Sequence, residues 1–421
     1  MSHPHRPPSR AREYRGHPPV WRWSLAPGIT ALQQTEEPYT CANAQITDAA
    51  QRPVFVGGAT DGWSGVAAQD LRRTDAGSTL LARKAWFFSD AGVVALGAGI
   101  ASSDGRFSAV TSVEQRPLDT SAGAVGGAWV GMSPAGSPPQ LLPAGELLEG
   151  VNVSWVWHAG VLYALSLPGS SIPGVNASTA VPAVSTRNQT GSWAAITQGP
   201  NATITTPTFL AYLHHGNVGV GARSAGEGGG APAAAGYAYA IIPGPASPQA
   251  AAAAYAALLN STAVLQNSAS TQAVCFGAPN SSTAWTLQVV AWPAQAGVGA
   301  AGTSSAATTP GAGLPPTRHL VRSGEEAGAP CPAAEVLSGP GLVQASLAVD
   351  GALTVTFADP TAAAIPRNAS VVLAGLRASG PCCTFNGSHT VVSAPLPVQP
   401  GYAGSSVTAI CQIIAWDSVR L

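Results

Sequence analysis

Charge is scarce in this 421-residue chain, and lysine is almost absent. Asp, Glu, Lys and Arg make up 9% of the residues, the formal net charge is −1, and Lys84 is the sole lysine among 19 basic residues. This composition lacks the basic surface of a nucleic-acid-binding protein and the polybasic segment of a membrane anchor. No uninterrupted apolar run approaches the roughly 20 residues of a membrane span. We therefore expect a soluble protein with neither nucleic-acid nor membrane partners.

Signatures of metal and cofactor binding are missing as well. There is no Cys-x-x-Cys pair, and the neighbours His214 and His215 would alternate across a strand, so we predict no metal site and no cofactor. The segment 97–102 imitates a dinucleotide-binding loop, but it lacks the third glycine and leads into a turn. Glycines that let strands pack closely are the better interpretation.

Cysteine is present six times, which is compatible with disulfide bonds in an oxidising compartment. Six cysteines allow 15 full pairings, and the sequence does not choose among them. Adjacent Cys382 and Cys383 would point to opposite faces of a strand, so they serve different partners or one of them stays free. The others are Cys41, Cys275, Cys331 and Cys411.

Short apolar runs separated by turn residues dominate the rest of the chain and predict an all-β protein. The clearest is 83–100, where two apolar strands flank a Ser-Asp-Ala-Gly turn and form a hairpin. One helix is predicted over 248–259, with Ser247 as its N-cap and Pro248 at the first helical position. Segments 222–235 and 294–316 are low in complexity and are interpreted as exposed insertions.

Eight segments stand out in chain order: Glu13-Tyr14, 20–23, 27–30, 54–66, 83–100, 110–116, 157–163 and 236–243. Taken together, they resemble the central β-domain of the family 8 polysaccharide lyases, which include hyaluronate, chondroitin AC and xanthan lyases. Ile29 departs from the family's usual Pro-Gly-Thr-Thr. A weaker resemblance to the family's C-terminal β-domain continues through 264–267, 351–355 and 359–361.

The resemblance implies an all-β fold, with a large antiparallel β-sandwich of the galactose-mutarotase-like supersandwich type followed by a smaller β-sandwich. We expect a disordered N-terminus over 1–12 and the central lyase-like domain over 13–246. A connecting helix over 247–260 leads to the C-terminal sandwich domain over 261–421, which contains the insertion 294–316.

The resemblance also implies a function. Family members cleave uronic-acid polysaccharides by β-elimination, and their catalytic Asn, His, Tyr and Arg lie in an N-terminal α/α toroid. Their catalytic Glu and a nearby Asn precede the Glu-Tyr motif, where this chain opens, so no catalytic residue can be assigned. We expect a non-catalytic β-domain portion that binds the polysaccharide and scaffolds the cleft, with a missing N-terminal helical domain of the same gene product as its partner. The alternative is a stand-alone secreted carbohydrate-binding or structural glycoprotein.

Two tryptophans are the candidates for sugar contact, because flat aromatic side chains stack on the apolar C–H faces of sugar rings. Trp63 lies in a glycine-rich loop, and Trp86 lies in the hairpin, where core packing is the main alternative. Glu114 and Arg116 share one strand face and are interpreted as an ion pair rather than as a receptor for a sugar carboxylate. His158 could be a general base, but the family places its base in the absent domain, which favours a structural role.

Eight Asn-x-Ser/Thr sequons indicate a eukaryotic secretory route and an extracellular glycoprotein, with chance occurrence as the alternative. No apolar signal-peptide core is present near Met1. Because signal peptide and toroid are both missing, we interpret the sequence as a fragment or an incomplete gene model. The candidate glycosylation sites are Asn152, Asn176, Asn188, Asn201, Asn260, Asn280, Asn368 and Asn386.

Overall fold

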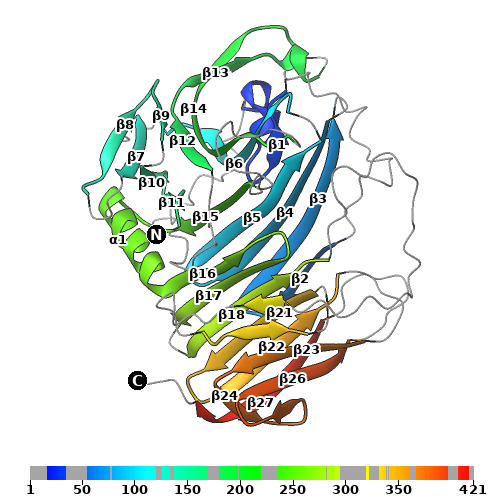
Figure 1. Cartoon of the computed structure of the whole chain (residues 1–421). Coiled ribbons are helices and arrows are strands. Elements are labelled where there is room, and N and C mark those ends of the chain that lie inside the picture. The colour runs from blue at the N-terminus through cyan, green and yellow to red at the C-terminus, as the bar shows by residue number, and fades with distance from the viewer. Residues whose placement is uncertain are drawn as a thin grey trace, which may run out of the picture.

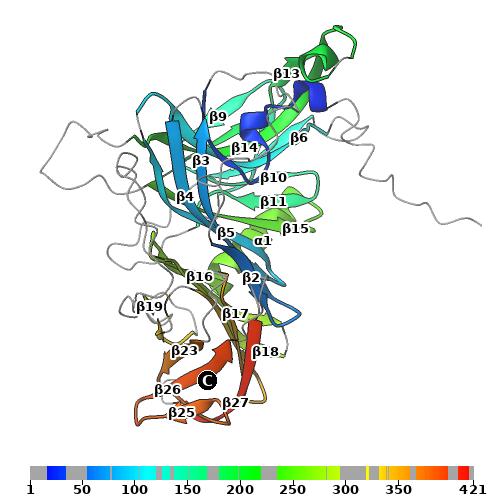
Figure 2. The same ribbon diagram turned by 90° about the vertical axis from the view of Figure 1, so that its right-hand side faces the viewer.

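The computed structural model shows a stack of β-sheets, and the one α-helix of the described residues lies at one side of the stack (Figures 1 and 2). All neighbouring strands within the sheets are antiparallel over the part of the chain that the structure describes. The described residues are 17–34, 55–75, 78–103, 105–119, 126–132, 137–150, 152–167, 180–197, 199–219, 235–280, 282–293, 319–321, 331–337, 339, 341–360, 367–396 and 406–416.

Two sheets make up the N-terminal half. The first sheet has the order β1 (Thr30–Leu32), β6 (Ser108–Pro117), β14 (Ile204–Asn217), β12 (Val181–Ser185) and β9 (Leu147–Glu149), with β13 (Asn188–Gly191) paired to β14. The second sheet has the order β2 (Val56–Thr60), β3 (Gly65–Asp75), β4 (Ser78–Ser89), β5 (Gly92–Ser102), β15 (Ala235–Pro243), β11 (Val161–Ala164), β10 (Val153–His158), β7 (Gly127–Met132) and β8 (Gln140–Pro143).

Two further sheets make up the C-terminal half. The third sheet has the order β16 (Thr262–Asn267), β17 (Thr271–Asn280), β18 (Thr283–Ala291), β21 (Gly341–Ala348), β22 (Ala352–Ala358), β27 (Ser406–Trp416) and β24 (Leu376–Ser379). The fourth sheet has the order β19 (His319–Val321), β20 (Ala334–Val336), β23 (Arg367–Ala374), β26 (His389–Leu396) and β25 (Cys383–Phe385).

Three hydrophobic cores join the four sheets into consecutive layers. The first core packs side chains such as Phe209 of the first sheet against Tyr239 of the second. The middle core joins the second sheet to the third, where Phe87 and Phe276 belong to one cluster. The last core lies between the third and fourth sheets and includes Trp285. The third sheet therefore buries side chains on both faces, and the N-terminal and C-terminal halves share a core.

The α-helix α1 (Pro248–Ser261) begins as the sequence predicts. Ser247 is its N-cap, and the Ser247 side chain accepts a hydrogen bond from the amide of Ala250. Tyr255 and Leu258 pack into the middle core, so the helix covers part of the second and third sheets (Figure 1). Short 3-10 turns are η2 (Pro18–Val20), η3 (Trp23–Leu25) and η6 (Trp193–Ala195).

The predicted all-β class is confirmed, since strands account for 65% of the described residues and helix for 8%. The 83–100 hairpin is formed by β4 and β5. Gly97 lies within β5, and a Cβ atom there would collide with the ring of Tyr237 on the neighbouring strand, which confirms a packing role for this glycine. None of the described helices is long and apolar enough to cross a membrane. The predicted segments 1–12 and 294–316, and 222–234 of the predicted insertion 222–235, lie outside the described residues.

Candidate carbohydrate-contact site

Trp63 lies in the turn that joins β2 to β3, and its side chain is 84% exposed. The backbone of the turn is fixed by the preceding Asp61. One carboxylate oxygen of Asp61, Oδ1, accepts hydrogen bonds from the amides of Trp63 at 2.9 Å and Ser64 at 2.8 Å. Such an Asx turn is the usual reason for an aspartate at the start of a tight turn. The indole therefore projects from an ordered loop.

The turn has further internal support. The Thr60 hydroxyl donates to the carbonyl of Ser64 at 2.6 Å and accepts from the amide of Gly62 at 3.0 Å. Gly62 has a φ of 97°, a left-handed conformation that favours glycine. The sequence Thr-Asp-Gly-Trp-Ser thus satisfies its own polar groups and leaves the tryptophan at the surface.

Asp61 also contacts the third sheet. The hydroxyl of Ser346, on β21, donates to Asp61 Oδ2 at 3.1 Å, and Gln344 Nε2 donates to the hydroxyl of Ser64 at 2.8 Å. Burial alone would raise the pKa of the Asp61 carboxyl, but the hydrogen bonds from Ser64, Trp63 and Ser346 together hold that pKa below its usual value of 3.8. The carboxylate is therefore charged at neutral pH.

Trp86, the second candidate, lies in β4 and is partly buried against the first core. It pairs across the sheet with Ala67, shortly after Trp63 in the chain, so the two tryptophans occupy the same end of adjacent strands. The Nζ atom of Lys84 lies 5.4 Å from the centre of the Trp86 ring, and Tyr239 is hydrogen-bonded to Trp86. These contacts make Trp86 mainly a packing residue.

The burial of Lys84 and its hydrogen-bond partner could not be inferred from composition alone. Lys84 as a whole is 3% exposed, and its ammonium group donates to the carbonyl of Gly28, which ties the Pro-Gly-Ile-Thr segment to the second sheet. Burial lowers the pKa of Lys84 to about 8. Lys84 is the sole lysine of the chain and lies inside an apolar strand. This was the signal in the sequence for a structural role of Lys84.

The remaining polar candidates lie between the first and second sheets. Tyr163 donates its hydroxyl to Glu114 Oε2 at 2.8 Å, and Arg116 is also hydrogen-bonded to Tyr163. Burial, followed by the nearby Glu114 charge, raises the pKa of Tyr163. Glu114 and Arg116 therefore both interact with the buried Tyr163, as expected of residues with a structural role.

His158 is a packed side chain at the end of β10. Its ring stacks on Phe209 with a centroid distance of 4.4 Å, and its Nε2 accepts from the amide of Asp119 at 3.1 Å. Burial, and then the charge of Arg116, lowers the pKa of His158 to about 4. The following Ala159 and Gly160 both have positive φ and form the tight turn between β10 and β11.

Six of the eight predicted glycosylation sites have exposed side chains. Asn280 is the last residue of β17, and its side chain and the whole of Asn176 lie outside the described part of the chain. The exposed six are Asn152, Asn188, Asn201, Asn260, Asn368 and Asn386.

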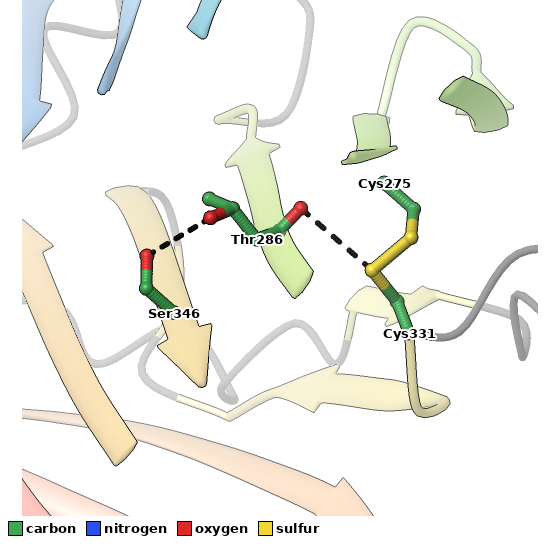
Figure 3. The surroundings of a disulfide bond; sticks show 4 residues. All are labelled: Cys275, Thr286, Cys331 and Ser346. Atoms are coloured by element: carbon green, nitrogen blue, oxygen red, sulfur yellow. Dashed lines mark hydrogen bonds between the residues drawn. A yellow bond between two sulfur atoms is a disulfide. The ribbon is translucent and has the colours of Figure 1, made fainter. Parts of the chain in front are cut away.

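Two disulfides are formed. Cys275 of β17 bonds to Cys331, close to the neighbouring strand β18 (Figure 3). Cys383 bonds to Cys411, while its neighbour Cys382 is free, so one of the alternatives for the adjacent pair is realised. Cys41 lies outside the described residues. Within the described ranges, no three His, Cys, Asp or Glu side chains gather into a group that could hold a metal ion.

Comparison with protein families places residues 9–255 in the super-sandwich domain of polysaccharide lyase family 8. Chondroitinase AC of Pedobacter heparinus is 28% identical over 246 residues, which are 57% of this chain and 28% of that enzyme. Hyaluronate lyase of Thermasporomyces composti is 38% identical over 92 residues, 22% of this chain and 11% of that enzyme.

Solved structures show the same architecture. Chondroitinase AC lyase, determined in oligosaccharide complexes, superposes with a TM-score of 0.63 and 22% identity over 94% of this chain and 45% of that one. Xanthan lyase of Paenibacillus gives a TM-score of 0.60 and 20% identity over 93% of this chain and 31% of that one. The chain thus spans less than half the length of these relatives.

Proposed function

Because the chain belongs to polysaccharide lyase family 8, we propose that it forms the β-domain portion of a lyase that acts on uronic-acid-containing glycans by β-elimination. The observation that carries this proposal is the match of residues 9–255 to the family's super-sandwich domain. The 28% identity to a chondroitinase makes a chondroitin-type glycan the first substrate to test. The match favours this function over that of a stand-alone structural glycoprotein.

Within the lyase, this portion supplies a wall and glycan contacts, and the base and acid lie elsewhere. β-Elimination needs a group that takes the proton next to a neutralised carboxylate and another that protonates the leaving oxygen. Both groups must reach the substrate. His158 Nε2 is occupied by a backbone amide, and the Tyr163 hydroxyl is held by Glu114. Their use in packing supports a non-catalytic role for this portion, with an N-terminal helical domain as its partner.

Trp63 is the glycan contact in this proposal. A largely exposed indole on an ordered loop offers a flat apolar face to solvent, and the C–H face of a pyranose ring can stack on such a face. Trp86 is a weaker candidate, because most of its ring contacts lie inside the protein.

We also propose that the protein is a secreted glycoprotein. Exposure of six sequons leaves them accessible to glycosylation, and two disulfides suit an oxidising compartment.

Isothermal titration calorimetry with a chondroitin sulfate hexasaccharide tests the glycan contact. We expect weak binding by the wild-type chain and an affinity about tenfold lower in Trp63→Ala, the equivalent of about 1.4 kcal/mol. Leu320→Ala removes an exposed apolar side chain from the fourth sheet and should leave the affinity unchanged. Equal affinities of wild type and Trp63→Ala would remove Trp63 from the proposal.

A further inference from the structure

We infer that the third sheet positions Trp63, with Asp61 as the positioning residue, so that the C-terminal half of the chain is part of the glycan contact. This inference rests on the proposed role of Trp63. In addition, the inference requires that Ser346 and Gln344, almost three hundred positions from Trp63 in the sequence, fix the loop that carries Trp63.

Two series of hydrogen-bonded side chains connect the third sheet to the Trp63 loop. In one, the hydroxyls of Thr286 and Ser346 lie 3.2 Å apart (Figure 3). Ser346 in turn donates to Asp61. Since a hydroxyl has one proton and Ser346 gives it to Asp61, Thr286 is the donor in the first link. The direction of both hydrogen bonds is therefore fixed by the carboxylate.

The second series of hydrogen bonds lies beside the first, on the same two strands, β18 and β21. Gln288 Nε2 donates to Gln344 Oε1 at 3.4 Å, and Gln344 Nε2 donates to the hydroxyl of Ser64 at 2.8 Å. Gln288 also donates to the carbonyl of Phe88, at the end of β4. Register explains the arrangement, because Gln288 lies opposite Gln344, and Thr286 lies opposite Ser346, on adjacent strands of the third sheet.

Burial makes these links hard to break. Thr286, Gln288 and Gln344 are each no more than 1% exposed, so their polar groups cannot turn to water when a partner is lost. Losing a partner would leave a buried polar group unsatisfied, which is strongly disfavoured. The loop is therefore held at two of its polar side chains, Asp61 and Ser64, by the C-terminal half.

A fixed loop matters for binding a sugar. A tryptophan on a loose loop would lose conformational freedom each time a glycan docked, which weakens the affinity. Here the turn is already ordered before binding, and Asp61 alone links the Trp63 amide to Ser346. The ligand class is the C–H face of a pyranose ring in an anionic, uronic-acid-containing chain.

Hydrogen exchange of the full chain, followed by mass spectrometry, tests the positioning without any glycan. In Ser346→Ala we expect the amides of Trp63 and Ser64 to exchange about tenfold faster, the effect of losing one hydrogen bond to a charged group. Asp61→Asn keeps an oxygen for those two amides, and its NH₂ group can donate to the Ser346 hydroxyl with the direction of the bond reversed, so its exchange should be slower than in Ser346→Ala. Asp61→Ala, which loses both sets of bonds, should exchange fastest.

Calorimetry with the same hexasaccharide completes the test. We expect Ser346→Ala to lower the affinity by about threefold to tenfold, and to have no further effect in the Trp63→Ala background, because it acts through Trp63. Ser370→Ala is the matched control, since it removes an equivalent hydroxyl pair, Ser370 with Ser393, from the fourth sheet.

The outcomes separate this inference from the proposed function. Unchanged exchange and affinity in Ser346→Ala would overturn the positioning role even if Trp63→Ala loses binding. Faster exchange with no glycan binding by any variant would keep the loop attachment but overturn the glycan contact. Additive losses in the double variant would mean that Ser346 acts elsewhere, and would also overturn the inference.

Discussion

At the scale of single residues, buried titratable side chains tie the stability of this protein to pH. His158 has a pKa of about 4 in the folded protein against 6.5 in the unfolded chain. The folded state therefore disfavours protonation. Its stabilising effect is fully present above pH 6.5 and is lost as the pH falls from 6.5 toward 4.

We predict that this one histidine contributes up to about 3 kcal/mol of acid sensitivity over that interval. In His158→Gln, whose amide oxygen can still accept from Asp119, the free energy of unfolding should change less between pH 6.5 and 4. Urea denaturation at several pH values measures the difference. Parallel pH profiles for wild type and variant would contradict the assignment.

The two candidate tryptophans should differ in what they contribute to stability. Trp86→Ala removes a partly buried ring from the first core and should cost about 3 kcal/mol, the lower end for a large aromatic. Trp63→Ala removes an exposed ring and should change the free energy of unfolding by less than about 0.5 kcal/mol. Chemical denaturation of both variants checks this, and a large loss in Trp63→Ala would show that the indole is a packing residue.

Local patterns were enough to identify some residues but not their distant partners. The Thr-Asp-Gly-Trp-Ser turn is readable as a tight turn, because the hydrogen bonds from the Trp63 and Ser64 amides to Asp61 are local. The contact of Asp61 with Ser346 and that of Lys84 with Gly28 are not readable, since they depend on which sheets stack.

At the scale of elements, short-range signals predicted the hairpin of β4 and β5 and the N-cap of α1. The order of strands within each sheet was not predictable. β5, for example, pairs with β15, and β18 pairs with β21, because burial of their side chains between layers sets the neighbours. The pairing of the cysteines could not be predicted for the same reason, since a disulfide forms only where the fold brings two cysteines that are distant in sequence close together.

The disulfide between Cys275 and Cys331 should stabilise the C-terminal half. It joins residues 56 positions apart, and closing a loop of this length in the unfolded chain accounts for about 4 kcal/mol. We predict that the double variant Cys275→Ala/Cys331→Ala unfolds at clearly lower urea concentration, whereas Cys382→Ala, which removes a free thiol, changes little. Equal losses in the two variants would show that the sulfur atoms matter through packing alone.

At the scale of the whole molecule, four sheets joined by three cores form a continuous scaffold. The middle core joins the two halves, and the Trp63 loop lies where the second and third sheets meet. This arrangement fits the role proposed for Trp63, because the loop that carries it is anchored to both halves of the described fold.

The most direct test of this account is a lyase assay of the purified chain on chondroitin, hyaluronan and xanthan, followed by the ultraviolet absorbance of the new carbon–carbon double bond. We predict no release of unsaturated uronic product, because the described histidine and tyrosine candidates are held by the core. Turnover that is lost in His158→Gln or Tyr163→Phe would contradict the account and would place the catalytic group within this chain.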